Sequence, residues 1–148
     1  MRDPRQLTML TDLAHERRDA AAKKLGRSLA FLQESQKRLA LLAQYRDDYR
    51  RRLATAAAGG VSGDELRNFR DFLARLDEAI AQQASEIQTL TQGVADCRVR
   101  WLAERRKQRS YDVLNERADF LARESEGRRL QKILDEFSGR SASLRAAG

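Results

Sequence analysis

The chain has 148 residues, of which 34% are charged and 6% aromatic, and its formal net charge is +7. One cysteine, Cys97, and one histidine, His15, exclude an internal disulfide and any metal site built from several such side chains. No apolar run approaches the ~20 residues of a membrane span and no signal peptide is visible, so we expect a soluble, cytoplasmic protein. The basic charge permits nucleic acid, an anionic membrane or an acidic protein as partner.

Helix signals divide the chain at a single point. Asp3 is a good cap and Pro4 suits the first helical position, which predicts a helix over about 4–58. The glycine cluster at 59–63 predicts a turn. Ser62 and Glu65 have the spacing of a capping box, so a second helix is expected over about 64–138. Glycine at position 139 marks its expected exit into a flexible tail, 139–148.

Apolar residues recur every seven positions in both predicted helices, which is typical of a coiled-coil seam. The first helix shows one phase slip, expected before Leu25, and one break at Arg46; the second is interrupted at Gln83. Two such helices joined by a short turn favour one all-α domain over 1–148, a long antiparallel coiled-coil hairpin. The second seam consists of Leu66, Phe69, Leu73, Leu76, Ile80, Ile87, Leu90, Val94, Cys97 and Trp101.

The two arms are unequal. Folding about residue 61 sets Leu7 opposite Asn115, so the chain after about Asp119 overhangs its partner by roughly 30 Å if it stays helical. This overhang is still amphipathic, which makes it a candidate docking face. Alternatively, the N-terminal segment or a second copy of the chain covers it. Its apolar residues are Phe120, Leu121, Leu130, Ile133, Leu134 and Phe137.

Near the turn, Phe69 falls on the seam, whereas Phe72 lies on its flank. A large aromatic side chain on the flank is expected to be partly exposed, and we consider two roles for it. Phe72 either closes the end of the seam as a plug or contacts a partner. His15 adjoins Ala14 in a charged helix, which predicts a solvated side chain.

No residue pattern carries catalysis. The sequence offers no converging carboxylates, no phosphate-binding loop and no metal-ligand set, so we expect no enzyme, no cofactor and no small-molecule substrate. Net charge is +6 over residues 1–58, −4 over 59–97 and +5 over 98–132. Acidic residues are interleaved with the basic ones at the open end, which favours a protein partner over nucleic acid.

These features together resemble the FliJ family of the bacterial flagellar type III export apparatus. The resemblance covers about Leu7 to Phe137. It is carried by the order of several stretches around the central turn, since each alone is a common coiled-coil pattern. These are LTDLAHERRDAAAKKLG ending at 26, YRDDYRRRL at 45–53, NFRDFLARLDEAIAQQ at 68–83, Trp101 with its basic followers, LNER at 114–117 and QKILDEF at 131–137.

The resemblance implies a hairpin similar to the central stalk of rotary ATP synthases. It implies a protein that inserts into and stimulates the export ATPase ring, binds the cytoplasmic domain of the membrane export gate, and escorts export chaperones. Such a protein is cytoplasmic and peripheral to the inner membrane at the flagellar base. For the gate, the candidate residues at the turn are Phe69, Phe72 and Leu76. For the ATPase, the candidates at the open end are Arg105, Arg106, Lys107, Arg109, Gln131, Lys132, Asp135 and Phe137.

Two other functions are compatible with the same residues. A basic coiled coil could bind nucleic acid or organise a scaffold, and copurifying absorbance at ~260 nm that is lost at high salt would favour it. The chain could also be the equivalent stalk of a virulence injectisome.

Overall fold

The computed structural model describes residues 3–147, which form two helices and no strand. Helix α1 spans Pro4–Ala58 (55 residues) and helix α2 spans Gly63–Ala147 (85 residues). The expected all-α hairpin with unequal arms is therefore confirmed. The chain divides into two compact units, which we call the turn unit (Asp19–Leu102) and the terminal unit (residues up to Arg18 together with those from Ala103 onward).

The helix ends follow the predicted capping signals. The Oδ1 atom of Asp3 accepts the N–H of Arg5 at 3.2 Å, as expected of a cap in front of Pro4. At the other end of α1, Gly60 has a φ of +77°, and Val61 N–H donates to the Ala56 carbonyl at 3.3 Å. This six-to-one bond across a left-handed glycine is a Schellman closure, which ends the helix sharply.

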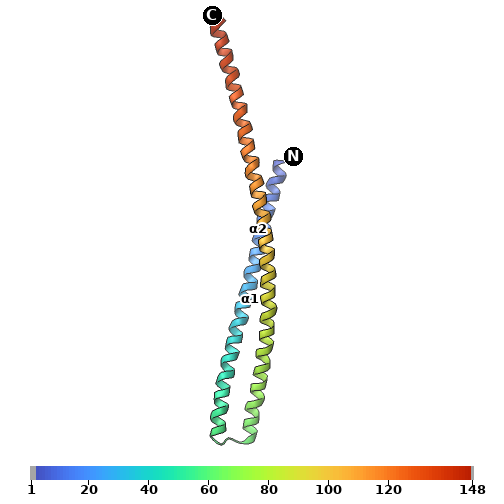
Figure 1. The fold of residues 1–148 in the computed structure, drawn as a ribbon, viewed down its shortest axis with the longest axis vertical. Coiled ribbons are helices and arrows are strands. Elements are labelled where there is room, and N and C mark those ends of the chain that lie inside the picture. Colours follow the sequence, from blue (N-terminus) through green and yellow to red (C-terminus); the bar gives the residue numbers. More distant parts are fainter. Residues whose placement is uncertain (1–2, 148) are drawn as a thin grey trace. The chain divides into compact units, whose positions relative to one another are not determined.

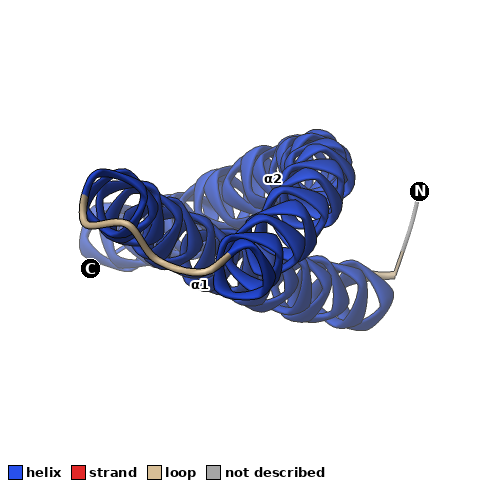
Figure 2. Cartoon of the chain, turned by 90° about the horizontal axis from the view of Figure 1, so that it is seen from below, coloured by secondary structure: helices blue, strands red, loops and turns tan. Residues whose placement is uncertain are grey.

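In the turn unit, α1 and α2 lie side by side in antiparallel directions, joined by the short loop drawn in tan in Figure 2 (Figures 1 and 2). The seam positions of both helices are buried or half-buried, with Leu76 and Val94 among the best covered. Trp101 and Cys97 are half-buried on this seam, as predicted. Burial of this apolar stripe stabilises the helix pair by roughly 25 cal/mol per Å².

Polar side chains occupy several seam positions, and two of those in the turn unit have a partner on the facing helix. Gln83, where the pattern breaks, donates its amide N–H to the Ser35 carbonyl at 3.1 Å. The hydroxyl of Ser28 lies 3.4 Å from the Cys97 sulfur. Buried polar groups cost little when they are hydrogen-bonded, so these layers interrupt the apolar seam without breaking it.

The phase slip expected before Leu25 is wrong. Buried and half-buried positions run without interruption at spacings of four and three from Leu7 to Leu25. Because Thr11 and Arg18 are polar, the heptad to which they belong is not visible as an apolar repeat in the sequence. The Thr11 hydroxyl donates to the Leu7 carbonyl of its own helix at 2.8 Å, so a hydroxyl is tolerated at a buried position.

The helix exit expected at Gly139 is also wrong, because α2 is helical from Gly63 to Ala147. A glycine ends a helix when it adopts positive φ, and among the described residues only Gly60 does so. Gly139 costs the helix about 1 kcal/mol relative to alanine, but the alanine, leucine and arginine that follow it are strong helix formers. Residues 139–147 are therefore helix, while position 148 lies outside the described residues.

Candidate partner-binding surfaces

An aromatic cluster lies near the turn, within the turn unit. The Tyr49 ring lies 4.3 Å from the Phe72 ring and 5.9 Å from the Phe69 ring, measured between centroids. These contacts join α1 to α2, so Phe72 does help to close the end of the seam. Phe72 nevertheless remains 39% exposed, and with Tyr49, Phe69, Glu65 and Asn68 it lines an open hollow.

Leu76 does not share this exposure. It is only 9% exposed and packs in the seam, so a surface contact through Leu76, expected from the resemblance, is not supported. The helical turn of α2 that contains Leu76 is instead joined to α1 by ion pairs. Asp77 lies 3.9 Å from Arg46 and 4.0 Å from Arg50, a pairing that gives Arg46 a partner at its seam position. The heptad break at Arg46 is therefore a cross-helix ion pair.

A polar cluster joins the helices inside the terminal unit. His15 Nε2 lies 2.8 Å from the Oδ1 atom of Asp112, and the Gln108 amide donates to the other oxygen of that carboxylate. The guanidinium of Arg18 donates in turn to the Gln108 carbonyl oxygen at 3.0 Å. A carboxylate only accepts, so His15 carries its proton on Nε2 in this pair. The expectation of a solvated His15 is therefore wrong.

The cluster changes the acidity of Asp112. The hydrogen bond from His15 lowers the pKa of that carboxyl most, opposed by partial burial and aided by Gln108 and by the charge of Arg18. A carboxyl whose folded pKa is lowered stabilises the fold fully above its unfolded pKa, near pH 4. That contribution is lost as the pH falls through the lowered folded value.

We therefore expect Asp112→Asn to destabilise the chain at neutral pH by up to about 1 kcal/mol, since the pair is partly exposed. The difference from wild type should hold down to about pH 5 and begin to shrink near pH 4, where the unfolded carboxyl takes up its proton. It should vanish only once the pH has fallen through the lowered pKa of Asp112 in the folded state. Urea unfolding followed by circular dichroism at several pH values measures it. A difference that stays constant into acid would show that Asp112 acts through packing rather than charge.

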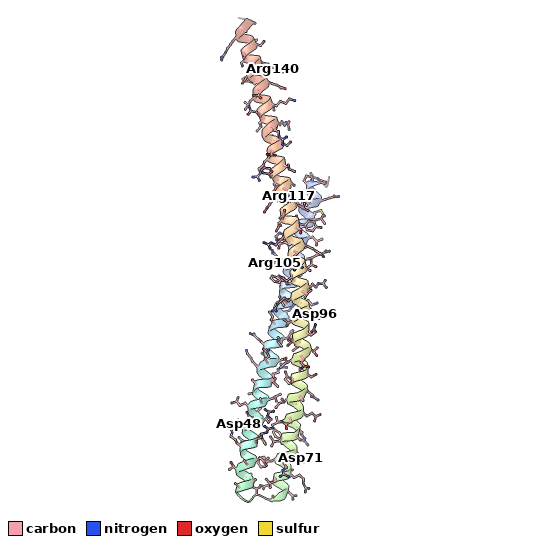
Figure 3. The ribbon with its side chains drawn as sticks, in the orientation of Figure 1. Asp48, Asp71, Asp96, Arg105, Arg117 and Arg140 are labelled. Atoms are coloured by element: carbon pink, nitrogen blue, oxygen red, sulfur yellow. The ribbon has the colours of Figure 1, made fainter. Side chains whose placement is uncertain are left out.

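The basic residues predicted for the ATPase side lie on α2 just after Ala103, where the terminal unit begins. Figure 3 labels Arg105 and Arg117 in this part of the helix. Arg105, Arg106, Lys107 and Arg109 are all exposed. They surround the helix, because consecutive residues are separated by about 100°. Only some of them can face a single partner.

The overhang also carries its predicted residues on different faces. Every residue from 119 to 140 is exposed, and Ala118 is the last half-buried residue before them, close to the predicted boundary at Asp119. Gln131 donates to Asp135 at 3.1 Å along one face of α2. Phe137 is 71% exposed and lies about 200° around the helix from Asp135. Lys132 is exposed and lies nearer the Asp135 face.

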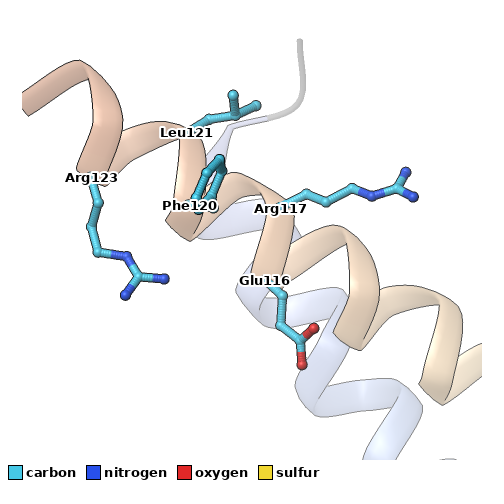
Figure 4. Close-up of a pocket in the computed structure, with 5 residues that line it drawn as sticks. All are labelled: Glu116, Arg117, Phe120, Leu121 and Arg123. Carbon is cyan, nitrogen blue, oxygen red and sulfur yellow. The ribbon is translucent and has the colours of Figure 1, made fainter.

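Among the described residues, no group of three His, Cys, Asp or Glu side chains could hold a metal ion. No helix in the described range is long and apolar enough to cross a membrane. The surfaces available are helix faces and shallow hollows, which suit protein partners. One hollow on α2, lined by Glu116, Arg117, Phe120, Leu121 and Arg123, is shown in Figure 4.

Comparison with known proteins decides the family. The family model described as "Flagellar FliJ protein" matches residues 3–147. The chain belongs to the FliJ family. It is 29% identical over 136 residues to the flagellar FliJ protein of Escherichia coli K12 and 30% identical over 136 residues to that of Salmonella typhi, with 92% of each chain covered. FliJ membership supports a role in flagellum biogenesis and flagellar protein export, and with it contact with components of the export apparatus.

Sequence reasoning missed two features of this site. One is the polar cluster of the terminal unit. Its signal was that Arg18 lies seven residues before Leu25 and Gln108 seven residues after Trp101, so that each continues the heptad of its helix. The other is the continuity of exposed basic and apolar residues on the side of α2 away from the seam.

Proposed function

We propose that this chain is a non-enzymatic stalk and adaptor, which binds and stimulates the flagellar export ATPase and couples it to the membrane export gate. The observation that carries the proposal is the exposed helical overhang of the terminal unit. From residue 119 to 140, α2 has no cover among the described residues, yet it presents large apolar side chains. An exposed apolar face of this length is a typical docking surface for another protein.

The basic residues Arg106 and Arg109 support an ATPase contact at the same unit, since they are exposed beside this overhang. Contact with the gate is proposed for the aromatic hollow of the turn unit, through Phe72 with Phe69. Escort of export chaperones and a cytoplasmic position against the inner membrane complete the proposal. They rest on the family alone.

The proposal is tested by titrating the full chain into the cognate export ATPase and following ATP hydrolysis. We expect hydrolysis to rise and to saturate with added chain. An active ATPase that does not respond would contradict the stalk role and return the nucleic-acid alternative to consideration.

For the gate, we expect Phe72→Ala to weaken binding to the cytoplasmic domain of the gate protein by roughly tenfold, as loss of an aromatic anchor typically does. Stimulation of the ATPase should be unchanged. Calorimetric titration measures the binding, and circular dichroism serves as control, because Phe72 also packs on Tyr49. If Phe72→Ala unfolds the turn unit, or leaves gate binding intact, Phe72 acts only as a plug.

A further inference from the structure

The side of α2 away from the seam carries a second stripe within the terminal unit. Its members recur at spacings of three and four, so they share one face of the helix. All of them are exposed, while the seam positions Glu104, Gln108 and Tyr111 point to the other side and are covered. The stripe, which we call the outer stripe, consists of Arg106, Arg109, Val113, Arg117, Phe120 and Leu121.

The outer stripe is hollowed as well as exposed. One hollow is lined by Arg106, Arg109 and Val113 with their neighbours, and a second by Phe120 and Leu121; both include Arg117. In Figure 4 Phe120 and Leu121 project from α2 between Arg117 and Arg123. The two hollows share Arg117 and therefore adjoin along α2. We call the surface that they line the groove; it is about 26 Å long, from residue 106 to residue 123, at 1.5 Å per residue.

Basic side chains outnumber acidic ones along this groove. Arg106, Arg109 and Arg117 form no ion pair within the described part of the chain, and Glu116 is the only acid among the lining residues. Val113 and Leu114 are each 44% exposed, and Phe120 and Leu121 are more exposed still. The groove thus offers guanidinium groups that form no ion pair within the described residues, beside apolar side chains that remain exposed.

We propose that the outer stripe binds an acidic amphipathic helix of a protein partner, about five turns long. Its leucine-type side chains would lie on Val113, Phe120 and Leu121, and its carboxylates would pair with the three arginines. Guanidinium groups pair bidentately with carboxylates, which gives such a contact both orientation and strength. The inference rests on the proposed function only in assigning that helix to the export machinery.

The position of the arginines favours a helix over a membrane or nucleic acid. Helices that lie on anionic membranes keep an uninterrupted apolar face with cations at its edges. Here Arg117 lies between Val113 and Phe120 on the same helix face, where insertion into lipid would bury it. Nucleic acid would use the arginines but leave Val113, Phe120 and Leu121 without a role.

The test uses the full chain and a labelled 18-residue synthetic peptide with leucine on one helical face and glutamate flanking it. We expect the peptide to bind, measured by fluorescence anisotropy at about 50 mM salt, where charge pairs are little screened. The triple variant Arg106→Glu, Arg109→Glu, Arg117→Glu should bind at least about tenfold more weakly. A matched variant, Arg67→Glu, Arg70→Glu, Arg75→Glu, changes the net charge equally on the same helix and should bind like wild type.

A second variant, Val113→Ser with Leu121→Ser, tests the apolar part without changing charge, and it should also weaken binding. Equal losses in both arginine variants would overturn the proposal, because attraction would then be non-specific. So would absence of peptide binding, or binding of phosphatidylserine vesicles in place of the peptide. Stimulation of the export ATPase, measured separately, distinguishes failure of this surface from failure of the stalk role.

Discussion

A chain truncated after Asp119 is expected to lose its stimulation of the export ATPase. The truncation removes the exposed overhang but leaves the covered seam of both units, which ends at Ala118. Burial of one phenylalanine side chain contributes about 1.5–3 kcal/mol, which is more than about tenfold in affinity. Loss of Phe120 and Phe137 together should therefore reduce the apparent affinity at least a hundredfold. Steady-state ATP hydrolysis at increasing chain concentration measures it.

Paired substitutions identify which face of the overhang makes the contact. Ile133→Ala with Phe137→Ala removes the apolar face, whereas Gln131→Ala with Asp135→Ala removes a polar pair from another face of the same turns. We expect the first pair to reproduce most of the truncation and the second to have little effect. Full stimulation by the truncated chain would move the ATPase contact elsewhere, and a reversed order would place it on the polar face.

The second large effect is expected on stability. Leu76→Ala should lower the free energy of unfolding by about 2–3 kcal/mol, because it removes a buried side chain from a core with few large ones. Leu7, Leu76 and Val94 are the only described residues larger than alanine among the buried apolar ones. For a domain with a total stability of about 5–15 kcal/mol this is a large fraction. Chemical denaturation followed by circular dichroism measures it.

Leu130→Ala is the matched control, since Leu130 is 54% exposed and the same atoms are removed from an uncovered site. It should change stability by less than about 0.5 kcal/mol. Equal effects of the two substitutions would mean that Leu76 is not in the core. If Leu76→Ala instead weakened gate binding while leaving stability unchanged, the surface role inferred from the resemblance would be restored.

Local chemistry made most of the fold predictable. Helix ends at Asp3, Ala58 and Ser62 depend on capping groups within a few residues, so the sequence alone places them. The heptad spacing of the second helix likewise predicts an antiparallel partner, because each apolar stripe requires cover. The prediction failed at Gly139, because a glycine near the end of a chain can either end a helix or continue one, and the neighbouring residues do not decide between the two.

Polar residues at the seam were the larger source of error. Thr11, Arg18 and Gln108 do not look like core residues, since burial of a polar group is unfavourable until its partner is known. Arg18 and Gln108 bond to each other across 90 residues of chain, whereas the Thr11 hydroxyl bonds to the Leu7 carbonyl of its own helix. The phase slip predicted before Leu25 and the solvated His15 both come from this missing information.

Two helices, one turn, the seam of the second helix and the family could be predicted from the amino-acid pattern, because these depend on short-range spacing and composition. Burial of Leu76 and partial exposure of Phe72 follow from their places on and beside the seam, but the stacking of Phe72 on Tyr49 is visible only in the folded helix pair. The same is true of the bond between Asp112 and His15. Pairing across the helices depends on which residues meet after folding, and no spacing within one helix specifies that.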